Sequence, residues 1–180
     1  MNKTLTLILG GARSGKSAHA QQLARERGGD DVLFVATAQA HDDEMETRIA
    51  AHRADRPAAW RTLEVPRHVG EAISQAGLCG VVLVDCLTLL LSNAVVALPE
   101  SASTAEAEAV ALAEVEELIA AYRRGMASWI VISNEVGLGL VPPYPMGRAY
   151  RDALGRANQH LAAEADEVLF MVAGIPMKVK

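Results

Sequence analysis

Five short runs of apolar, largely β-branched residues recur along the chain and predict buried strands. They cover residues 5–9, 32–36, 81–84, 129–133 and 168–172. Strands that are buried on both faces read as continuous apolar runs, whereas half-exposed strands alternate with polar residues. The pattern therefore predicts a sheet with both faces covered. A short edge strand is expected within residues 174–180.

Helical patterns lie between these runs. Residues 16–27 are rich in good helix formers and stop at two glycines. Residues 103–124 open with Ser103 and Glu106, the pair that forms a capping box. Residues 148–165 carry an apolar stripe at helical spacing. The stripe consists of Tyr150, Leu154, Ala157 and Leu161.

Strands that alternate with helices favour a mainly parallel sheet, connected by right-handed crossovers and covered by helices on both faces. The predicted fold class is therefore α/β, in a single domain that spans residues 1–180. Pro142, Pro143 and Pro145 predict a loop that follows Gly137 and Gly139.

The overall composition excludes several classes of partner. A net charge of −5, a pI near 5.5 and few aromatic residues give no basic surface or stacking platform for nucleic acid. The apolar stretch over residues 80–98 contains Asp85 and suits a strand followed by a helix better than a membrane span. Cys79 and Cys86 are expected to be buried packing residues in a reducing compartment. With no signal peptide indicated, the expected location is cytoplasmic.

The strongest motif is a GxxxxGK[ST] loop between the first predicted strand and the first predicted helix. Its backbone N–H groups and the helix N-terminus would cradle the phosphates of a nucleoside triphosphate. Lys16 would reach the β- and γ-phosphates. The fold is thus predicted to be P-loop NTPase-like, of the RecA-like type; the alternative is an ordinary glycine-rich turn. The loop residues are Gly10, Gly11, Ala12, Arg13, Ser14, Gly15, Lys16 and Ser17.

A P-loop site also needs an acid at the end of a hydrophobic strand, which we expect next to the loop. Asp85 follows the apolar run 81–84 and is the candidate. Ser17 and Asp85 would contact Mg²⁺, with most of the ion's ligands left to phosphate and water. The alternative role for Asp85 is the N-cap of a helix that begins near Leu87, and the two roles are compatible.

A second candidate helix covers residues 42–53 and carries a histidine. Met45, Ile49 and His52 fall on one helical face, with Arg48 one turn before the histidine. This spacing alone does not separate a chemical role for His52 from that of a capping or core histidine.

Six segments together resemble one family over nearly the whole chain. They are GGARSGKS, ATA, DDEMETRIAAHR with RPAAWRTLE, VDCLTLLLSN, SNEVGLGLVP and GRAYRDALGRANQHLAAEADEV. The chain resembles the bifunctional adenosylcobinamide kinase and adenosylcobinamide-phosphate guanylyltransferase of cobalamin biosynthesis. His41 before the Asp–Asp pair and the proline-rich stretch near residue 143 depart from that pattern, which affects only the expected loop shapes.

The resemblance implies two reactions. ATP or GTP would phosphorylate the aminopropanol hydroxyl of adenosylcobinamide, and GMP would then be transferred from GTP onto that phosphate with release of pyrophosphate. The guanylyl group would first be carried by His52, which matches the family's histidine within RIAAHR. A homo-oligomer, specifically a trimer, is expected by the same resemblance.

The resemblance also assigns a set of residues to the GTP site. A carboxylate suits guanine, because it accepts hydrogen bonds from both the ring N–H and the exocyclic amine. Arg48, Arg53 and Arg56 lie near His52 in sequence and would offset phosphate charge, although each could be a solvated surface arginine. The assigned residues are Ala36, Thr37, Ala38, Arg53, Arg56, Glu64 and Asp85.

Several assignments stay open from the sequence. Asp85, Asp43 and Glu135 are all conceivable bases for the kinase step, and the segment 133–137 either lines the corrinoid or nucleotide pocket or forms a turn. No zinc site is expected, because the remaining histidines form no metal-ligand motif. The functional alternatives are another small-molecule P-loop kinase, in which His52 has no chemical role, and an NTP-driven switch or ATPase.

Overall fold

A seven-stranded sheet runs through the centre of the molecule in the order β3-β2-β4-β5-β1-β6-β7. The computed structural model describes residues 3–40, 43–54, 56–99 and 101–180. Neighbouring strands pair in parallel, except that β7 returns antiparallel to β6. The strands are β1 (Leu5–Gly10), β2 (Val32–Ala36), β3 (Arg61–Glu64), β4 (Val81–Asp85), β5 (Ser128–Ile132), β6 (Glu167–Val172) and β7 (Ile175–Lys178).

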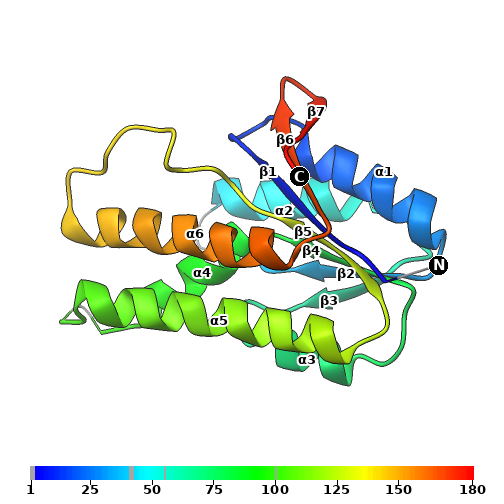
Figure 1. Cartoon of the computed structure of the whole chain (residues 1–180), viewed down its shortest axis with the longest axis horizontal. Helices are drawn as coiled ribbons and strands as arrows, with labels where there is room; N and C mark the ends of the chain where they lie inside the picture. The colour runs from blue at the N-terminus through cyan, green and yellow to red at the C-terminus, as the bar shows by residue number, and fades with distance from the viewer. Residues whose placement is uncertain (1–2, 41–42, 55, 100) are drawn as a thin grey trace.

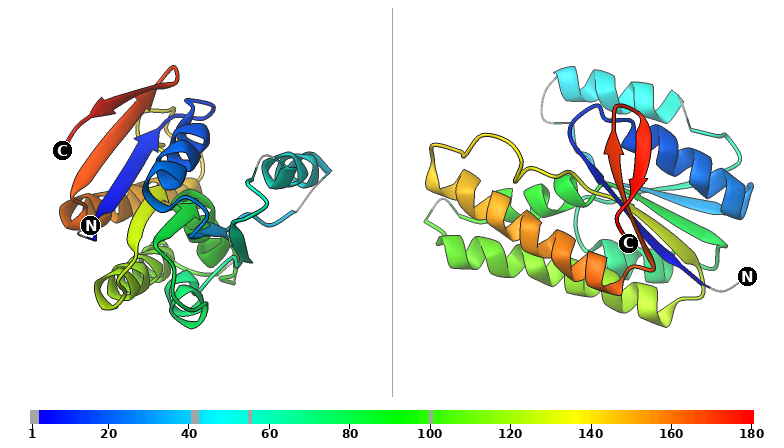
Figure 2. Two further views of the ribbon diagram at one scale, coloured as in Figure 1. Left: turned by 90° about the vertical axis from the view of Figure 1, so that its right-hand side faces the viewer. Right: turned by 45° about the horizontal axis from the view of Figure 1, so that its top comes forward.

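Helices cover both faces of this sheet. Figure 1 shows α1 on one side and α4, α5 and α6 on the other. Helix α2 stands apart from these layers, beyond the β2 and β3 side of the sheet (Figure 2). The helices are α1 (Lys16–Gly28), α2 (Asp43–Ala54), α3 (Val69–Gln75), α4 (Leu87–Val96), α5 (Thr104–Arg124) and α6 (Pro145–Glu164).

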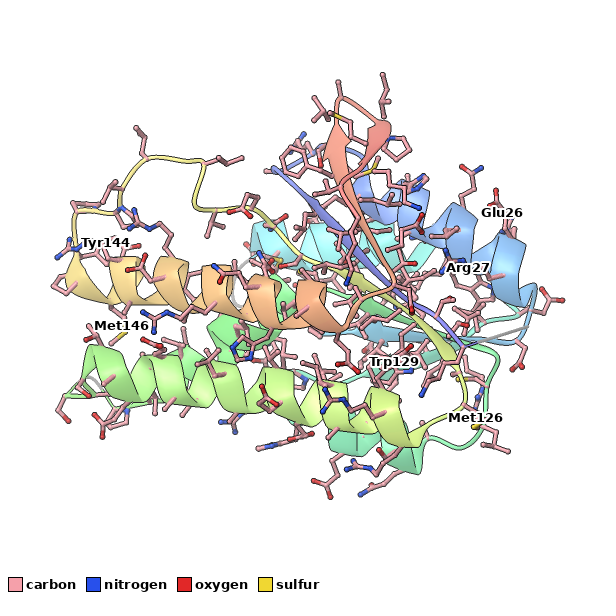
Figure 3. All side chains as sticks on the ribbon, viewed as in Figure 1. Glu26, Arg27, Met126, Trp129, Tyr144 and Met146 are labelled. Carbon is pink, nitrogen blue, oxygen red and sulfur yellow. The ribbon has the colours of Figure 1, made fainter. Side chains whose placement is uncertain are left out.

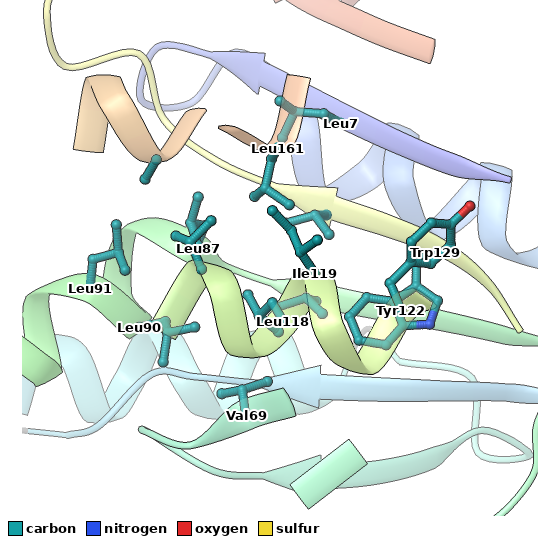
Figure 4. Packing of buried hydrophobic residues seen from close by; sticks show 14 of the residues in the cluster. Leu7, Val69, Leu87, Leu90, Leu91, Leu118, Ile119, Tyr122, Trp129 and Leu161 are labelled. Atoms are coloured by element: carbon teal, nitrogen blue, oxygen red, sulfur yellow. The ribbon is translucent and has the colours of Figure 1, made fainter. Parts of the chain in front are cut away.

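The larger core lies between the sheet and the four helices α3 to α6. Figure 4 shows Leu87, Leu90 and Leu91 of α4 and Leu118 of α5 in this layer. Each of these side chains is at most 1% exposed. Burying one leucine stabilises a fold by about 1.5–3 kcal/mol, so this layer supplies much of the driving force.

The smaller core lies under α1. This helix presents Ala20 and Ala24, both fully buried, to the strand face that carries Phe34 and Leu83. Small side chains let the helix backbone approach the strands closely. The start of α1 is thereby held firmly against the sheet.

Most of the predicted elements are confirmed. The five apolar runs form β1, β2, β4, β5 and β6, and β7 is the expected edge strand. The capping box at α5 is present: the Ser103 hydroxyl accepts from the Glu106 N–H at 3.2 Å, and the Glu106 carboxylate accepts from the Ser103 N–H at 2.7 Å. Leu154, Ala157 and Leu161 of the α6 stripe are buried.

The expected loop is confirmed at Pro142 and Pro143 but is wrong at Pro145. Pro145 begins α6 and occupies its first helical position, where a missing N–H and a fixed φ cost nothing. Tyr144 and Met146, on either side of it, lie at the start of this helix (Figure 3). The helix is therefore longer at its N-terminus than the sequence pattern indicated.

Two short elements, β3 and α3, were not predicted. Strand β3 has the sequence RTLE, is largely exposed and pairs only with β2. Helix α3 depends on carboxylates of α5: the His68 N–H donates to both oxygens of Glu114 at 3.0 Å, and the Glu71 N–H donates to Glu117 at 2.7 Å. Such partners are remote in sequence, so no local pattern indicates them.

Among the described helices, none combines the length and the apolar character that a membrane crossing requires.

The crossing of α3 and α5 generates a stability prediction. A Cβ at Gly70 would lie 2.5 Å from the carbonyl oxygen of Glu117, a backbone atom that cannot move aside cheaply. Gly70→Ala should therefore lower the free energy of unfolding by about 1–3 kcal/mol. Gly155→Ala is the control, because a Cβ at Gly155 in α6 meets nothing within 4 Å. The control should raise stability by about 0.5–1 kcal/mol. Urea unfolding measures both, and equal effects would contradict the close approach.

Candidate nucleotide site

The loop between β1 and α1 has a tightly curled backbone with several positive φ angles. Gly10 and Gly15 have φ of +151° and +94°, and Arg13 also has a positive φ of +56°. A Cβ at Gly10 would lie 2.7 Å from the Ser14 hydroxyl oxygen and 2.8 Å from the Met171 carbonyl oxygen. The glycines of the motif thus allow the loop to curl at the N-terminus of α1, where helix geometry favours a bound anion.

The turn between β6 and β7 braces this loop. The Gly174 N–H donates to the Ser14 carbonyl at 2.9 Å, and a Cβ on Gly15 would lie 3.0 Å from the Gly174 Cα. Ala173 and Gly174 have φ of +50° and +83°, as the two central residues of a tight hairpin turn require. The phosphate loop is therefore fixed in part by residues from the far end of the chain.

Lys16 lies inside the loop. Its ammonium group donates to the Gly11 carbonyl at 2.6 Å, and the residue is 8% exposed. Burial lowers the pKa of Lys16, while the nearby Cys86 and Asp85 act in the opposite direction. A partly desolvated cation at this position favours an approaching phosphate.

Two buried polar atoms in this region have no hydrogen-bond partner among the described residues: Ser14 Oγ and Arg56 Nε. Buried polar groups in folded proteins are nearly always paired, and an unpaired group often marks a binding site. One of these atoms belongs to the phosphate loop and the other to the segment after α2.

The ends of β2, β3 and β4 place three predicted residues side by side. Ala36 pairs with Glu64 on one side and with Asp85 on the other. In parallel sheets, ligands bind outside the carboxyl ends of the strands. The structure therefore brings Ala36, Glu64 and Asp85 together at the edge where the sequence predicted a nucleotide.

Thr37 ties two of these strand ends together. Its N–H donates to the Asp85 carbonyl at 3.2 Å, and its hydroxyl donates to the Cys86 carbonyl and accepts from the Cys86 N–H, both at 2.8 Å. The Asn93 amide donates to the Thr37 carbonyl at 2.8 Å. The segment that continues to Ala38 is thereby held at a fixed distance from Asp85.

Arg56 is largely buried, which corrects the alternative of a solvated surface arginine. Its guanidinium carbon lies 4.1 Å from the centroid of the Phe34 ring, and its side chain is 9% exposed. Burial lowers the pKa of Arg56, while Glu64 and Asp85 raise it. A terminal nitrogen lies 3.9 Å from Glu64 Oε1.

Arg53, at the end of α2, is exposed and paired with Glu64. Its Nε donates to Glu64 Oε1 at 2.7 Å and its Nη2 donates to Oε2 at 2.6 Å. The hydrogen bonds from Arg53 hold the pKa of Glu64 below its usual value. The carboxylate expected to read guanine is therefore ionised and oriented.

Asp85 lies at the end of β4. The expectation that this strand lies next to the phosphate-loop strand is wrong. β5 lies between β4 and β1 in the sheet. Asp85 still acts electrostatically on Lys16. The N-cap alternative is wrong, because Cys86 occupies the N-cap position of α4.

The histidine helix is present as α2, and its backbone includes residues 48 and 52. The side chains of Arg48 and His52 lie outside what the structure describes, as does His41. Their predicted roles stay predictions.

Cys86 is buried as expected, which raises the pKa of its thiol to about 12, and Cys79 is half-buried.

A buried polar network after β5 was missed in the sequence. The Ser133 hydroxyl donates to Asn158 Oδ1 at 2.7 Å, and the Asn158 amide donates to the Asn134 carbonyl at 3.2 Å. The Asn134 N–H donates to the Thr88 hydroxyl at 2.9 Å, while the Tyr150 hydroxyl donates to the Thr88 carbonyl at 2.7 Å. Tyr150 was expected only as part of an apolar stripe, and polar atoms at its tip give no periodic signal.

A groove of about 590 Å³ lies beside the phosphate loop, and Ser17 is the loop residue that lines it. Ser17 and Asp85 offer oxygen donors that suit Mg²⁺ once phosphate oxygens and water complete the shell. Among the described residues, no group of three or more His, Cys, Asp or Glu side chains is placed to hold a metal ion. The other lining residues are Ala18, Gln21, Gln22, Arg25, Pro57 and Trp60.

Comparison with known proteins identifies close relatives. A family model described as cobinamide kinase / cobinamide phosphate guanyltransferase matches residues 6–179. The bifunctional adenosylcobalamin biosynthesis protein CobU of Salmonella typhimurium is 43% identical over 98% of this chain and 99% of its own length. The bifunctional adenosylcobalamin biosynthesis protein CobP of Pseudomonas aeruginosa is 45% identical over 97% of this chain and 96% of its own length.

A solved structure shares the fold at low sequence identity. The flagellar accessory protein FlaH of Methanocaldococcus jannaschii superposes with a TM-score of 0.54 at 15% identity, covering 98% of this chain and 78% of that one. At this identity the likeness concerns the fold alone, and it confirms the predicted α/β class.

The Thr37 contacts generate a prediction about the site. Thr37→Val removes the hydroxyl and leaves the N–H of Cys86 unpaired in a buried region, while the Cys86 carbonyl keeps its bond from the Leu90 N–H. The free energy of unfolding should fall by about 1–3 kcal/mol. Nucleotide binding should weaken, because the hydrogen bonds that join the end of β2 to the end of β4 through the Thr37 hydroxyl are lost. Thr37→Ser keeps the hydroxyl and is the control. Unfolding and nucleotide titrations measure the two effects, and a valine variant as stable as the serine variant would contradict this role.

Proposed function

This chain belongs to the cobinamide kinase / cobinamide phosphate guanyltransferase family, and from that premise we propose which of its residues serve each of the two reactions. The observation that carries the proposal is the phosphate loop, in which Lys16 is buried and the Ser14 hydroxyl lacks a partner among the described residues. The family unites both activities. A kinase without nucleotidyl transfer and a nucleotide-driven switch are therefore set aside.

In the kinase reaction, Lys16 and the loop backbone bind the β- and γ-phosphates of ATP or GTP. The aminopropanol hydroxyl of adenosylcobinamide attacks the γ-phosphorus in line and gives up its proton. The bond from the γ-phosphorus to the bridging oxygen breaks, and the nucleoside diphosphate leaves. Ser17 and Asp85 would hold Mg²⁺, which neutralises charge on the phosphates when bound. The protein supplies mainly position and positive charge, so this step needs no protein nucleophile.

In the guanylyl reaction, a neutral His52 nitrogen attacks the α-phosphorus of GTP. The bond between the α-phosphorus and the bridging oxygen breaks, pyrophosphate leaves, and GMP stays on the histidine as a phosphoramidate. A phosphate oxygen of adenosylcobinamide phosphate then attacks the same phosphorus and displaces the histidine. The products are adenosyl-GDP-cobinamide and the restored enzyme.

Recognition of guanine is assigned to Glu64 at the end of β3. Its ionised carboxylate can accept hydrogen bonds from the ring N–H and the exocyclic amine together. Arg56, fixed over Phe34, lies 3.9 Å from Glu64 and adds to the effect of Arg53 in lowering the pKa of this carboxyl group. Ala36, Thr37 and Ala38 form the neighbouring wall of the site.

Assembly and location are also part of the proposal. One domain over residues 1–180 carries both reactions, the chain forms a homotrimer, and it acts in the cytoplasm. A large corrinoid needs more concave surface than a chain of this size offers, which favours a site completed by an oligomer.

The covalent step predicts a mass change. Incubation with GTP and Mg²⁺ should add one guanylyl group to the wild-type protein, and ATP should add none. His52→Ala should form no adduct, because the attacking nitrogen is gone. Intact-protein mass spectrometry measures this directly.

His160→Ala is the matched control, since His160 is an exposed histidine paired with Glu116 on the far helices. It should form the adduct normally. Retained phosphorylation of cobinamide by His52→Ala would show that this variant is folded. An adduct that persists in His52→Ala would move the nucleophile elsewhere, and no adduct in any protein would refute the covalent mechanism.

A further inference from the structure

The contact between Arg53 and Glu64 joins two side chains through two nearly equal hydrogen bonds. Nε bonds to Oε1 at 2.7 Å and Nη2 bonds to Oε2 at 2.6 Å, so each carboxylate oxygen accepts one N–H. This two-point geometry is the characteristic match between a guanidinium and a carboxylate.

Guanine contains the same chemical unit. Its ring N1–H and its exocyclic N2–H₂ are attached to one carbon and present two parallel donors, as Nε and Nη2 of arginine do. A carboxylate that fits one fits the other. The Arg53 side chain therefore occupies, on Glu64, the two acceptors that the proposed function assigns to guanine.

We propose that Arg53 is an internal mimic of guanine, which the base of GTP must displace from Glu64. This inference rests on the proposed role of Glu64. It makes Arg53 a specificity-determining residue, because only a base with two adjacent donors can replace both hydrogen bonds. Adenine presents one acceptor beside its amine and leaves a carboxylate oxygen unpaired.

Displacement of Arg53 also delivers a positive charge. Arg53 follows His52 directly in α2, so a guanidinium released from Glu64 remains on the same helical turn as the proposed nucleophile. There it can pair with the phosphates of the bound GTP. Recognition of the base at β3 is thereby coupled to the charge around the reacting phosphorus.

Arg56 cannot take this role. Its side chain is 9% exposed and lies over Phe34, and its approach to Glu64 is 3.9 Å, which is too long for a hydrogen bond. The Arg53 and Glu64 side chains are 56% and 46% exposed, so their pairing opens readily. An exposed pair of this kind shifts an equilibrium by roughly fivefold at most.

Guanosine is the probe that isolates the base, because it has no phosphate with which Arg53 could pair. Removal of the mimic should tighten the binding of guanosine by about two- to fivefold in Arg53→Ala. Arg53→Met keeps the length of the side chain without its donors and should behave in the same way. GTP affinity should improve less than guanosine affinity, because GTP loses a phosphate partner. Equilibrium titration of the full-length proteins measures each value.

Arg123→Ala is the matched control. Arg123 forms the same two-point pair with Glu164, at 3.0 and 2.7 Å, between α5 and α6. Its removal changes the net charge equally and should leave guanosine binding unchanged. Unchanged or weaker guanosine binding in both Arg53 variants would overturn the proposal.

Glu64→Gln separates this proposal from the proposed function. Loss of guanosine binding in Glu64→Gln, together with tightening in the Arg53 variants, supports both. Loss in Glu64→Gln with no tightening overturns the mimic and leaves Glu64 as the guanine reader. Wild-type guanosine affinity in Glu64→Gln overturns the role of Glu64, and the mimic with it.

Discussion

The parallel register of β2, β3 and β4 aligns Glu64, Ala36 and Asp85 in one row at the carboxyl edge of the sheet. Main-chain hydrogen bonds fix this row, and a slip of one residue would turn every side chain to the opposite face. The strands themselves are held by cores on both faces. Packing far from the site therefore determines where its carboxylates lie.

The charged side chains of the site differ in how deeply they are buried. Lys16 and Arg56 are largely buried, and desolvation lowers the pKa of both. Arg53 and Glu64 are exposed and neutralise each other. Asp85 acts on both of these partly dehydrated cations. Together they favour a polyanion, because the protein has already borne the cost of burying them. The inner part of the site is thus suited to phosphate and the outer part to a polar base.

The sequence predicted the elements whose signal is local. Apolar runs, the Ser103 capping box and the glycines of the phosphate loop each act within a few residues, and all are confirmed. The sequence did not predict α3, whose caps come from α5, or the position of β5 between β4 and β1. The buried state of Arg56 depends on Phe34, a residue more than twenty positions away. Contacts of this kind require the tertiary structure.

The contacts that support the phosphate loop cannot all form when the loop itself is made. Its strand, β1, is made before the other strands of the sheet, but both of its neighbours, β5 and β6, are made after β2, β3 and β4. The turn that holds the Ser14 carbonyl comes later still, at Gly174, after β6. The apolar strand β1 therefore lacks both of its neighbours in the sheet until β5 has been made. The phosphate loop, although made early, thus gains its full set of supporting contacts only after β5, β6 and Gly174 have been made.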